Sequence, residues 1–175
     1  MRNIDGRSST DAKTRLQTAL NRIVWDIHLD KIPQDLCYNQ IEILKLSLKK
    51  GADPNIPFHK GFSAWAAALS RCHPTDVASA NAWADIIEAM VRGRADPNAE
   101  ILDVCAIRDD ANDTHDWLSP LSIIRENFRP QGKSKLEDRR IKHISDRLQA
   151  QLLEAGGKYF TRQLESSMMT RRGFF

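Results

Sequence analysis

The chain has 175 residues, of which 41% are hydrophobic and 28% charged, a composition typical of one soluble domain with its own core. No apolar run approaches the roughly 20 residues that a membrane-spanning helix needs. The N-terminal MRNIDGRSSTDAK lacks the apolar stretch of a secretory signal, and the three cysteines form no pair with disulfide or zinc spacing. We therefore expect an intracellular protein, cytoplasmic or nuclear, that is neither secreted nor bound to a membrane.

The net charge of +3 is distributed unevenly along the chain. Residues 1–124 carry 14 basic and 17 acidic side chains, whereas residues 125–175 carry 12 basic and 6 acidic ones. A polyanion is therefore expected to prefer the C-terminal third of the chain.

The N-terminal part, residues 1–38, is predicted to form a helical cap. Apolar residues recur at three- and four-residue steps over residues 10–29, which predicts a helix with one buried stripe. Ser9 or Thr10 is expected to be its N-cap, because a hydroxyl there can accept a hydrogen bond from a free amide of the first turn.

The next predicted helix starts at Asn39, because Glu42 follows three residues later as in a capping box. Its apolar residues point to more than one side, which favours a position between neighbouring elements. Gly51 is expected to end it, since glycine adopts the left-handed conformation that closes many helices. The sequence Ala-Asp-Pro-Asn follows at residues 52–55 and cannot continue a helix.

Two helices follow, and the second of them ends in the same four letters. The first starts at its N-cap Ser63, and the second covers residues 81–92, with a long connection between them. Trp65 and Trp83 stand at helical spacing among alanines and isoleucines and are expected in the core. The second helix then runs into another Ala-Asp-Pro-Asn, residues 95–98.

The residue that ends this second helix is not settled by the sequence. Arg94 occupies the position that Gly51 has in the first copy. Either Arg94 adopts the left-handed conformation, at a cost of about 1 kcal/mol, or Gly93 moves the helix end by one residue.

Two more helices and a tail complete the chain. Ser119 is the expected N-cap of a helix with Pro120 at its first position, and a long amphipathic helix covers residues 136–155. The tail, residues 161–175, is predicted to form a short helix. No segment shows the alternation of a good strand, so the predicted fold class is all-α.

The repeated turns resemble those of the ankyrin-repeat family. The resemblance rests on LSLKKGADPN at residues 46–55, on AMVRGRADPN at residues 89–98, and on SAWA and SPLS where the family's Thr-Pro-Leu-His box begins a repeat. QLLEAGGKY at residues 151–159 is similar to a third helix end. The resemblance covers residues 39–160 as two to three degenerate, insertion-bearing repeats, similar to those of large fungal multidomain proteins. It implies a single domain in which helix pairs stack with long hairpin-finger loops between helical caps.

The resemblance also implies a function. Proteins of this family present a concave surface and finger loops to protein partners, so a protein-binding module without catalytic residues, metal or cofactor is expected, on its own or as part of a larger protein or complex. The predicted partner-binding residues are the finger tips: Phe58, His59, Lys60, Asp109, Asp110 and Asp113. Phe58 is a candidate binding hot spot, and packing beneath the finger is the equally supported alternative.

The acidic finger also invites comparison with a calcium loop. Asp110, Asn112 and Thr114 imitate its first positions, but the glycine and the late glutamate are missing, so a solvated finger is favoured.

The alternative function is binding of nucleic acid or another polyanion through the basic helix 125–147. This segment carries eight basic side chains: Arg125, Arg129, Lys133, Lys135, Arg139, Arg140, Lys142 and Arg147. The set lacks interleaved aromatic residues and is diluted by acidic ones, so a solvated helix face is favoured over a nucleic-acid site.

Overall fold

The computed structural model describes residues 5–27, 34–59, 61–102, 116–129 and 134–163. This part of the chain contains six helices and five strands, and each strand is only two or three residues long. The expected all-α class is therefore confirmed. None of the described helices combines the length and the apolar character needed to cross a membrane.

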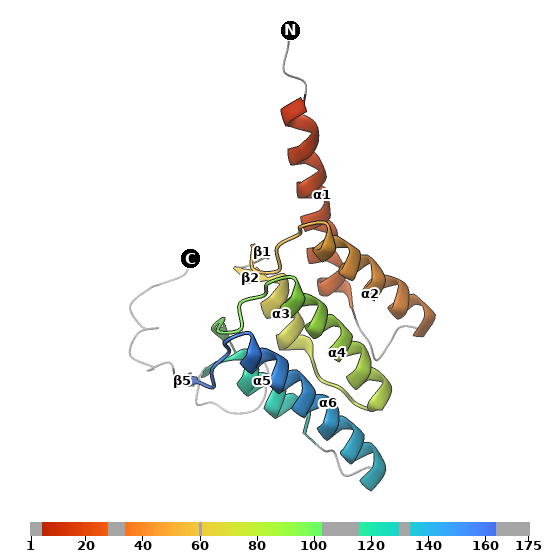
Figure 1. Ribbon diagram of the computed structural model, residues 1–175, viewed down its shortest axis with the longest axis vertical. Helices are drawn as coiled ribbons and strands as arrows, with labels where there is room; N and C mark the ends of the chain where they lie inside the picture. Colours follow the sequence, from red (N-terminus) through yellow and green to blue (C-terminus); the bar gives the residue numbers. More distant parts are fainter. Residues whose placement is uncertain (1–4, 28–33, 60, 103–115, 130–133, 164–175) are drawn as a thin grey trace, which may run out of the picture.

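Consecutive helices form three pairs. The pairs are α1 (Asp5–Asp26) with α2 (Gln34–Lys49), α3 (Ala64–Arg71) with α4 (Val77–Arg92), and α5 (Pro120–Asn127) with α6 (Lys135–Glu154). The first helix of each pair packs against the first helix of the next, and the second helices do the same. Two helical layers result, and Figure 1 shows α2, α4 and α6 side by side in the second layer.

Short antiparallel hairpins precede the second and third pairs. β1 (Pro57–His59) pairs with β2 (Phe62–Ser63) before α3, and β3 (Ile101–Leu102) pairs with β4 (Asp116–Leu118) before α5. β5 (Thr161–Gln163) follows α6 and pairs with β4. The helix expected for the tail is therefore wrong for residues 161–163, and the rest of the tail lies outside the described residues.

The serine N-caps predicted for α3 and α5 are confirmed. Ser63 Oγ accepts a hydrogen bond from the amide of Ala66 at 3.1 Å, and Ser119 Oγ accepts one from the amide of Ser122 at 3.1 Å. Pro120 occupies the first turn of α5, where its missing N–H has no partner to lose.

Three helices begin earlier than predicted. α1 starts at Asp5, so its expected caps, Ser9 or Thr10, lie inside the helix. α2 starts at Gln34, so the expected start at Asn39 also lies inside the helix. α4 begins at Val77 because Asp76 Oδ1 accepts a hydrogen bond from the amide of Ser79 at 2.7 Å, while Ser79 Oγ accepts one from the amide of Asp76 at 3.1 Å. Part of the expected connection before residue 81 is therefore helical.

The hydrophobic core lies between the two layers and continues from α1 to α6. Trp65 and Trp83 are buried as predicted, with 0% and 3% of their surface exposed. Burial of one large apolar side chain contributes about 1.5–3 kcal/mol. The helices of the second layer approach closely, since a Cβ atom on Gly93 would lie 3.0 Å from the Leu48 side chain.

Candidate functional site

The ends of α2, α4 and α6 are built alike. At each end one residue has a left-handed backbone: Gly51 with φ 96°, Arg94 with φ 66° and Gly156 with φ 90°. Its amide donates to the carbonyl three residues earlier, and the next amide donates to the carbonyl five residues earlier, all at 2.8–3.0 Å. Arg94 therefore adopts the left-handed conformation, whereas the C-cap Gly93 has a φ of −76°. The alternative that Gly93 moves the helix end by one residue is wrong.

The two Ala-Asp-Pro-Asn turns lie in matching surroundings. In each turn the aspartate accepts a hydrogen bond from the amide two residues later at 2.9 Å, Asp53 from Asn55 and Asp96 from Asn98. The Asn55 side chain also bonds the second turn, since Nδ2 donates to the Arg94 carbonyl and Oδ1 accepts from the Asp96 amide, each at 2.8 Å. One turn thus holds the next in place.

The same link appears on both sides of this pair of turns. The Asn98 side chain donates to the Gly156 carbonyl at 3.0 Å and accepts from the Lys158 amide at 2.9 Å. On α1, the Gln17 side chain donates to the Asp53 carbonyl and accepts from the Asp53 amide, each at 2.8 Å. Three amide side chains therefore connect α1 and the three helix ends in succession.

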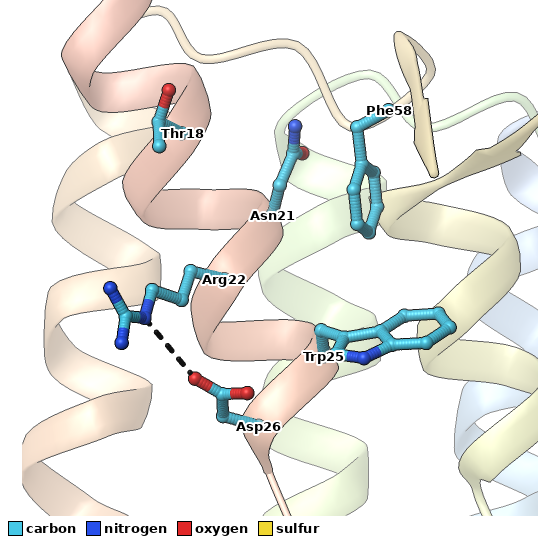
Figure 2. A pocket seen from close by; sticks show the side chains of 6 residues that line it. All are labelled: Thr18, Asn21, Arg22, Trp25, Asp26 and Phe58. Atoms are coloured by element: carbon cyan, nitrogen blue, oxygen red, sulfur yellow. Dashed lines mark hydrogen bonds and ion pairs between the residues drawn. The ribbon is translucent and has the colours of Figure 1, made fainter. Parts of the chain in front are cut away.

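A cleft of about 410 Å³ lies between α1 and the first hairpin. Its lining side chains are Thr18, Asn21, Arg22, Trp25 and Asp26 of α1 and Phe58 of β1. Figure 2 shows the Phe58 ring directed toward Trp25, while Arg22 and Asp26 of the same helix point away from this aromatic pair. Asn21 is nearly buried and accepts a hydrogen bond from Gln17 at 3.1 Å, which connects the cleft to the first turn.

The aromatic wall of the cleft is fixed by long-range contacts. The rings of Trp25 and Phe58 meet edge to face with centroids 6.0 Å apart, a contact worth about 0.5–1.5 kcal/mol. The Arg71 guanidinium lies 4.6 Å from the Trp25 ring centroid and donates a hydrogen bond to the Trp25 carbonyl. Burial lowers the pKa of Arg71, against the opposing charge of Asp26, and the guanidinium stays charged at neutral pH.

One predicted partner-binding residue lines this cleft. Phe58 is part-buried against the core, so it packs under the hairpin and contributes its ring to the cleft wall. His59 is the last residue of β1. The remaining predicted residues lie outside the described part of the chain: Lys60, Asp109, Asp110 and Asp113.

Trp25 is the functional candidate that the sequence analysis missed. Its neighbour Val24 belongs to the buried stripe of α1, and a helix turns about 100° per residue. Trp25 therefore points away from the stripe and keeps 37% of its surface exposed. A tryptophan outside the apolar stripe of an amphipathic helix is the signal that would have identified it.

The chemistry of the lining side chains suits binding. The hydroxyl of Thr18 donates to the Thr14 carbonyl at 2.9 Å, and none of the side chains that line the cleft is a histidine or a cysteine. Burial raises the pKa of the Cys72 thiol in the core, which keeps it protonated and unreactive at neutral pH. The described residues contain no cluster of histidine, cysteine or carboxylate side chains able to hold a metal ion. The cleft offers an aromatic surface with a polar rim, the usual composition of a binding hot spot.

Neither protein-family models nor curated proteins match this sequence. Function is therefore inferred from the residues and contacts of the chain itself.

Proposed function

We propose that this protein is a non-catalytic protein-binding module built as a degenerate ankyrin-type stack. The pairing of consecutive helices in two layers, the hairpins before α3 and α5, and the linked Ala-Asp-Pro-Asn turns all support this proposal. The repeats are longer than the family period of about 33 residues. From Gly51 to Arg94 the chain advances 43 positions, and from Arg94 to Gly156 it advances 62. We therefore assign an insertion, relative to the family period, to each of these two intervals.

The observation that carries the function is Trp25, which is partly exposed although two side chains from other elements pack against its ring. Its ring is held by Phe58 on one side and by the Arg71 guanidinium on the other. An aromatic side chain that is already ordered loses little conformational entropy when a partner binds. A partner segment that places an apolar side chain against this ring gains about 25 cal/mol for each Å² of apolar surface removed from water.

The polar rim favours a peptide segment as the ligand. Arg22 and Asp26 form an ion pair at 3.4 Å whose side chains are 83% and 53% exposed, so solvent screens it and it contributes little to stability. Both side chains are therefore available to bond the backbone of a bound segment. Asn21 lies deeper in the cleft and offers its amide group to the same ligand.

Selection of peptides from a random displayed library, followed by fluorescence anisotropy, tests this site. We expect selected peptides to bind the wild-type protein and to bind Thr18→Arg about tenfold more weakly or worse, because a long side chain at this exposed position fills the cleft. Ala12→Arg adds the same side chain at another exposed position of α1 and is expected to bind normally. Thermal unfolding followed by circular dichroism verifies that both variants are folded.

A second pair of variants removes the aromatic contact itself. Trp25→Ala is expected to abolish binding of the selected peptides, whereas Tyr38→Ala, which truncates a 63% exposed aromatic residue on α2, leaves it unchanged. Selected peptides that bind Thr18→Arg and Trp25→Ala as tightly as the wild type would refute this site, and so would a selection that enriches no peptide.

A further inference from the structure

A second groove, of about 460 Å³, lies between the start of α4 and the middle of α6. It is lined by three arginines and a histidine of α6, with apolar contributions from both helices: Arg139, Arg140, His143, Arg147, Ile144 and Val77. None of the side chains that line it is acidic. The groove therefore concentrates positive charge next to a small apolar surface.

The basic side chains in and around the groove differ in whether a carboxylate pairs with them. Outside the groove, Arg129 pairs with Glu126 at 2.7 Å and Lys142 pairs with Asp146 at 2.6 Å. Arg139 and Arg140 are exposed, and in the described part of the chain no carboxylate lies within ion-pair distance of either. Arg139 and Arg140 are therefore the groove charges that remain available to a ligand.

At one end of the groove, Arg147 is held by an ion pair with α4. Its guanidinium lies 2.9 Å from Glu88 of α4, in an ion pair without hydrogen-bond alignment, and Glu88 also accepts a hydrogen bond from Arg92 at 3.0 Å. Arg139, His143 and Arg147 follow at four-residue steps and so lie on one side of α6. Arg139 and Arg147 therefore place a guanidinium group at each end of this row of side chains.

We propose that this groove binds an acidic segment of a protein partner. Guanidinium groups form paired hydrogen bonds with carboxylates, and two of them, Arg139 and Arg140, are free to do so. Val77, which is only partly buried, gives an aliphatic side chain of the same segment a surface to contact. A single-stranded nucleic acid needs aromatic side chains on which its bases stack, and the groove lining has none. This proposal takes up the alternative function of residues 125–147, polyanion binding, for one site and for one class of ligand, an acidic protein segment. The site is separate from the cleft at Trp25.

Fluorescence anisotropy with a short labelled peptide of alternating glutamate and leucine tests the groove. The expected result is salt-sensitive binding that falls about tenfold or more in Arg139→Gln/Arg140→Gln. The control Lys135→Gln/Lys142→Gln removes the same charge from exposed positions of α6 outside the groove and is expected to change affinity by less than about twofold. The matched peptide of glutamine and leucine is expected to bind about tenfold more weakly.

Three results would overturn the proposal. Equal losses in the two double variants would show that net charge alone attracts the peptide, and equal binding of the glutamine peptide would show that carboxylates are not recognised. Tighter binding of a short single-stranded oligonucleotide, lost in Arg139→Gln/Arg140→Gln, would assign the groove to nucleic acid. Thr18→Arg is expected to bind the acidic peptide normally, so failure at the α1 cleft and failure at this groove are distinguishable.

Discussion

Two buried tryptophans differ in one hydrogen bond. The indole Nε1 of Trp65, on α3, donates to the carbonyl of Asp96 at 2.8 Å and so ties the core of one helix pair to the turn of the next. The indole N–H of Trp83, on α4, has no hydrogen-bond partner among the described residues. A buried polar group without a partner costs about 1–3 kcal/mol, so the two side chains contribute differently although both are buried.

Replacement of each tryptophan by phenylalanine measures that difference. We expect Trp65→Phe to lower the free energy of unfolding by about 1–3 kcal/mol more than Trp83→Phe, because only the first change breaks a hydrogen bond. It leaves the Asp96 carbonyl with only the longer bond, 3.3 Å, from the Ala99 amide. The two changes remove the same atoms from buried sites, so their cavity terms are comparable. Urea unfolding followed by circular dichroism gives both values, and an equal or larger loss for Trp83→Phe would contradict the assignment.

At the scale of the element, the sequence predicted those helix caps and helix ends that depend on contacts within one turn of the helix. Ser63, Ser119 and Gly51 act within one turn of their own helix, and all three act as predicted. The early start of α4 was missed because its capping box uses Ser79 where the usual pattern has glutamate or glutamine.

The cleft could not be predicted because it depends on contacts between distant segments. Trp25 meets Phe58 and Arg71 only after α1 has packed against α3 and the first hairpin has folded beside it. Helical periodicity indicates which face of α1 is buried, but it does not indicate what covers the opposite face. The aromatic wall therefore emerges only in the folded chain.

Opposite substitutions at two of the three helix ends test whether each end requires a left-handed residue. Arg94→Gly is expected to raise the free energy of unfolding by about 0.5–1 kcal/mol, because glycine removes the steric cost of φ 66°. Gly51→Ala is expected to lower it by about 1 kcal/mol, since the added Cβ meets no atom within 4 Å and only the backbone is strained. Thermal and urea unfolding measure both. A destabilising Arg94→Gly together with a neutral Gly51→Ala would contradict the shared geometry of these ends.

At the scale of the whole molecule, successive pairs repeat one arrangement. Lys45 Nζ of α2 lies 3.2 Å from Asp85 of α4, and Glu88 of α4 lies 2.9 Å from Arg147 of α6. Lys45 and Glu88 each stand six positions before the left-handed residue at the end of their own helix. Asp85 and Arg147 each stand nine positions before it. Both side chains of the Lys45–Asp85 pair are partly exposed, so that pair contributes about 0–1 kcal/mol. In the second pair the Glu88 side chain is only 12% exposed.

The central claim is that each turn is held by an amide side chain from the unit before it. Residue-resolved amide hydrogen exchange, measured by NMR, tests that claim most directly, because Asn55 accepts from the Asp96 amide and Asn98 from the Lys158 amide. We expect slow exchange at both amides in the wild type. Asn55→Ala should accelerate exchange at Asp96 about tenfold or more and spare Lys158, and Asn98→Ala should do the reverse. Fast exchange at both amides in the wild type, or an Asp96 amide that Asn55→Ala leaves unchanged, would contradict the stacked arrangement.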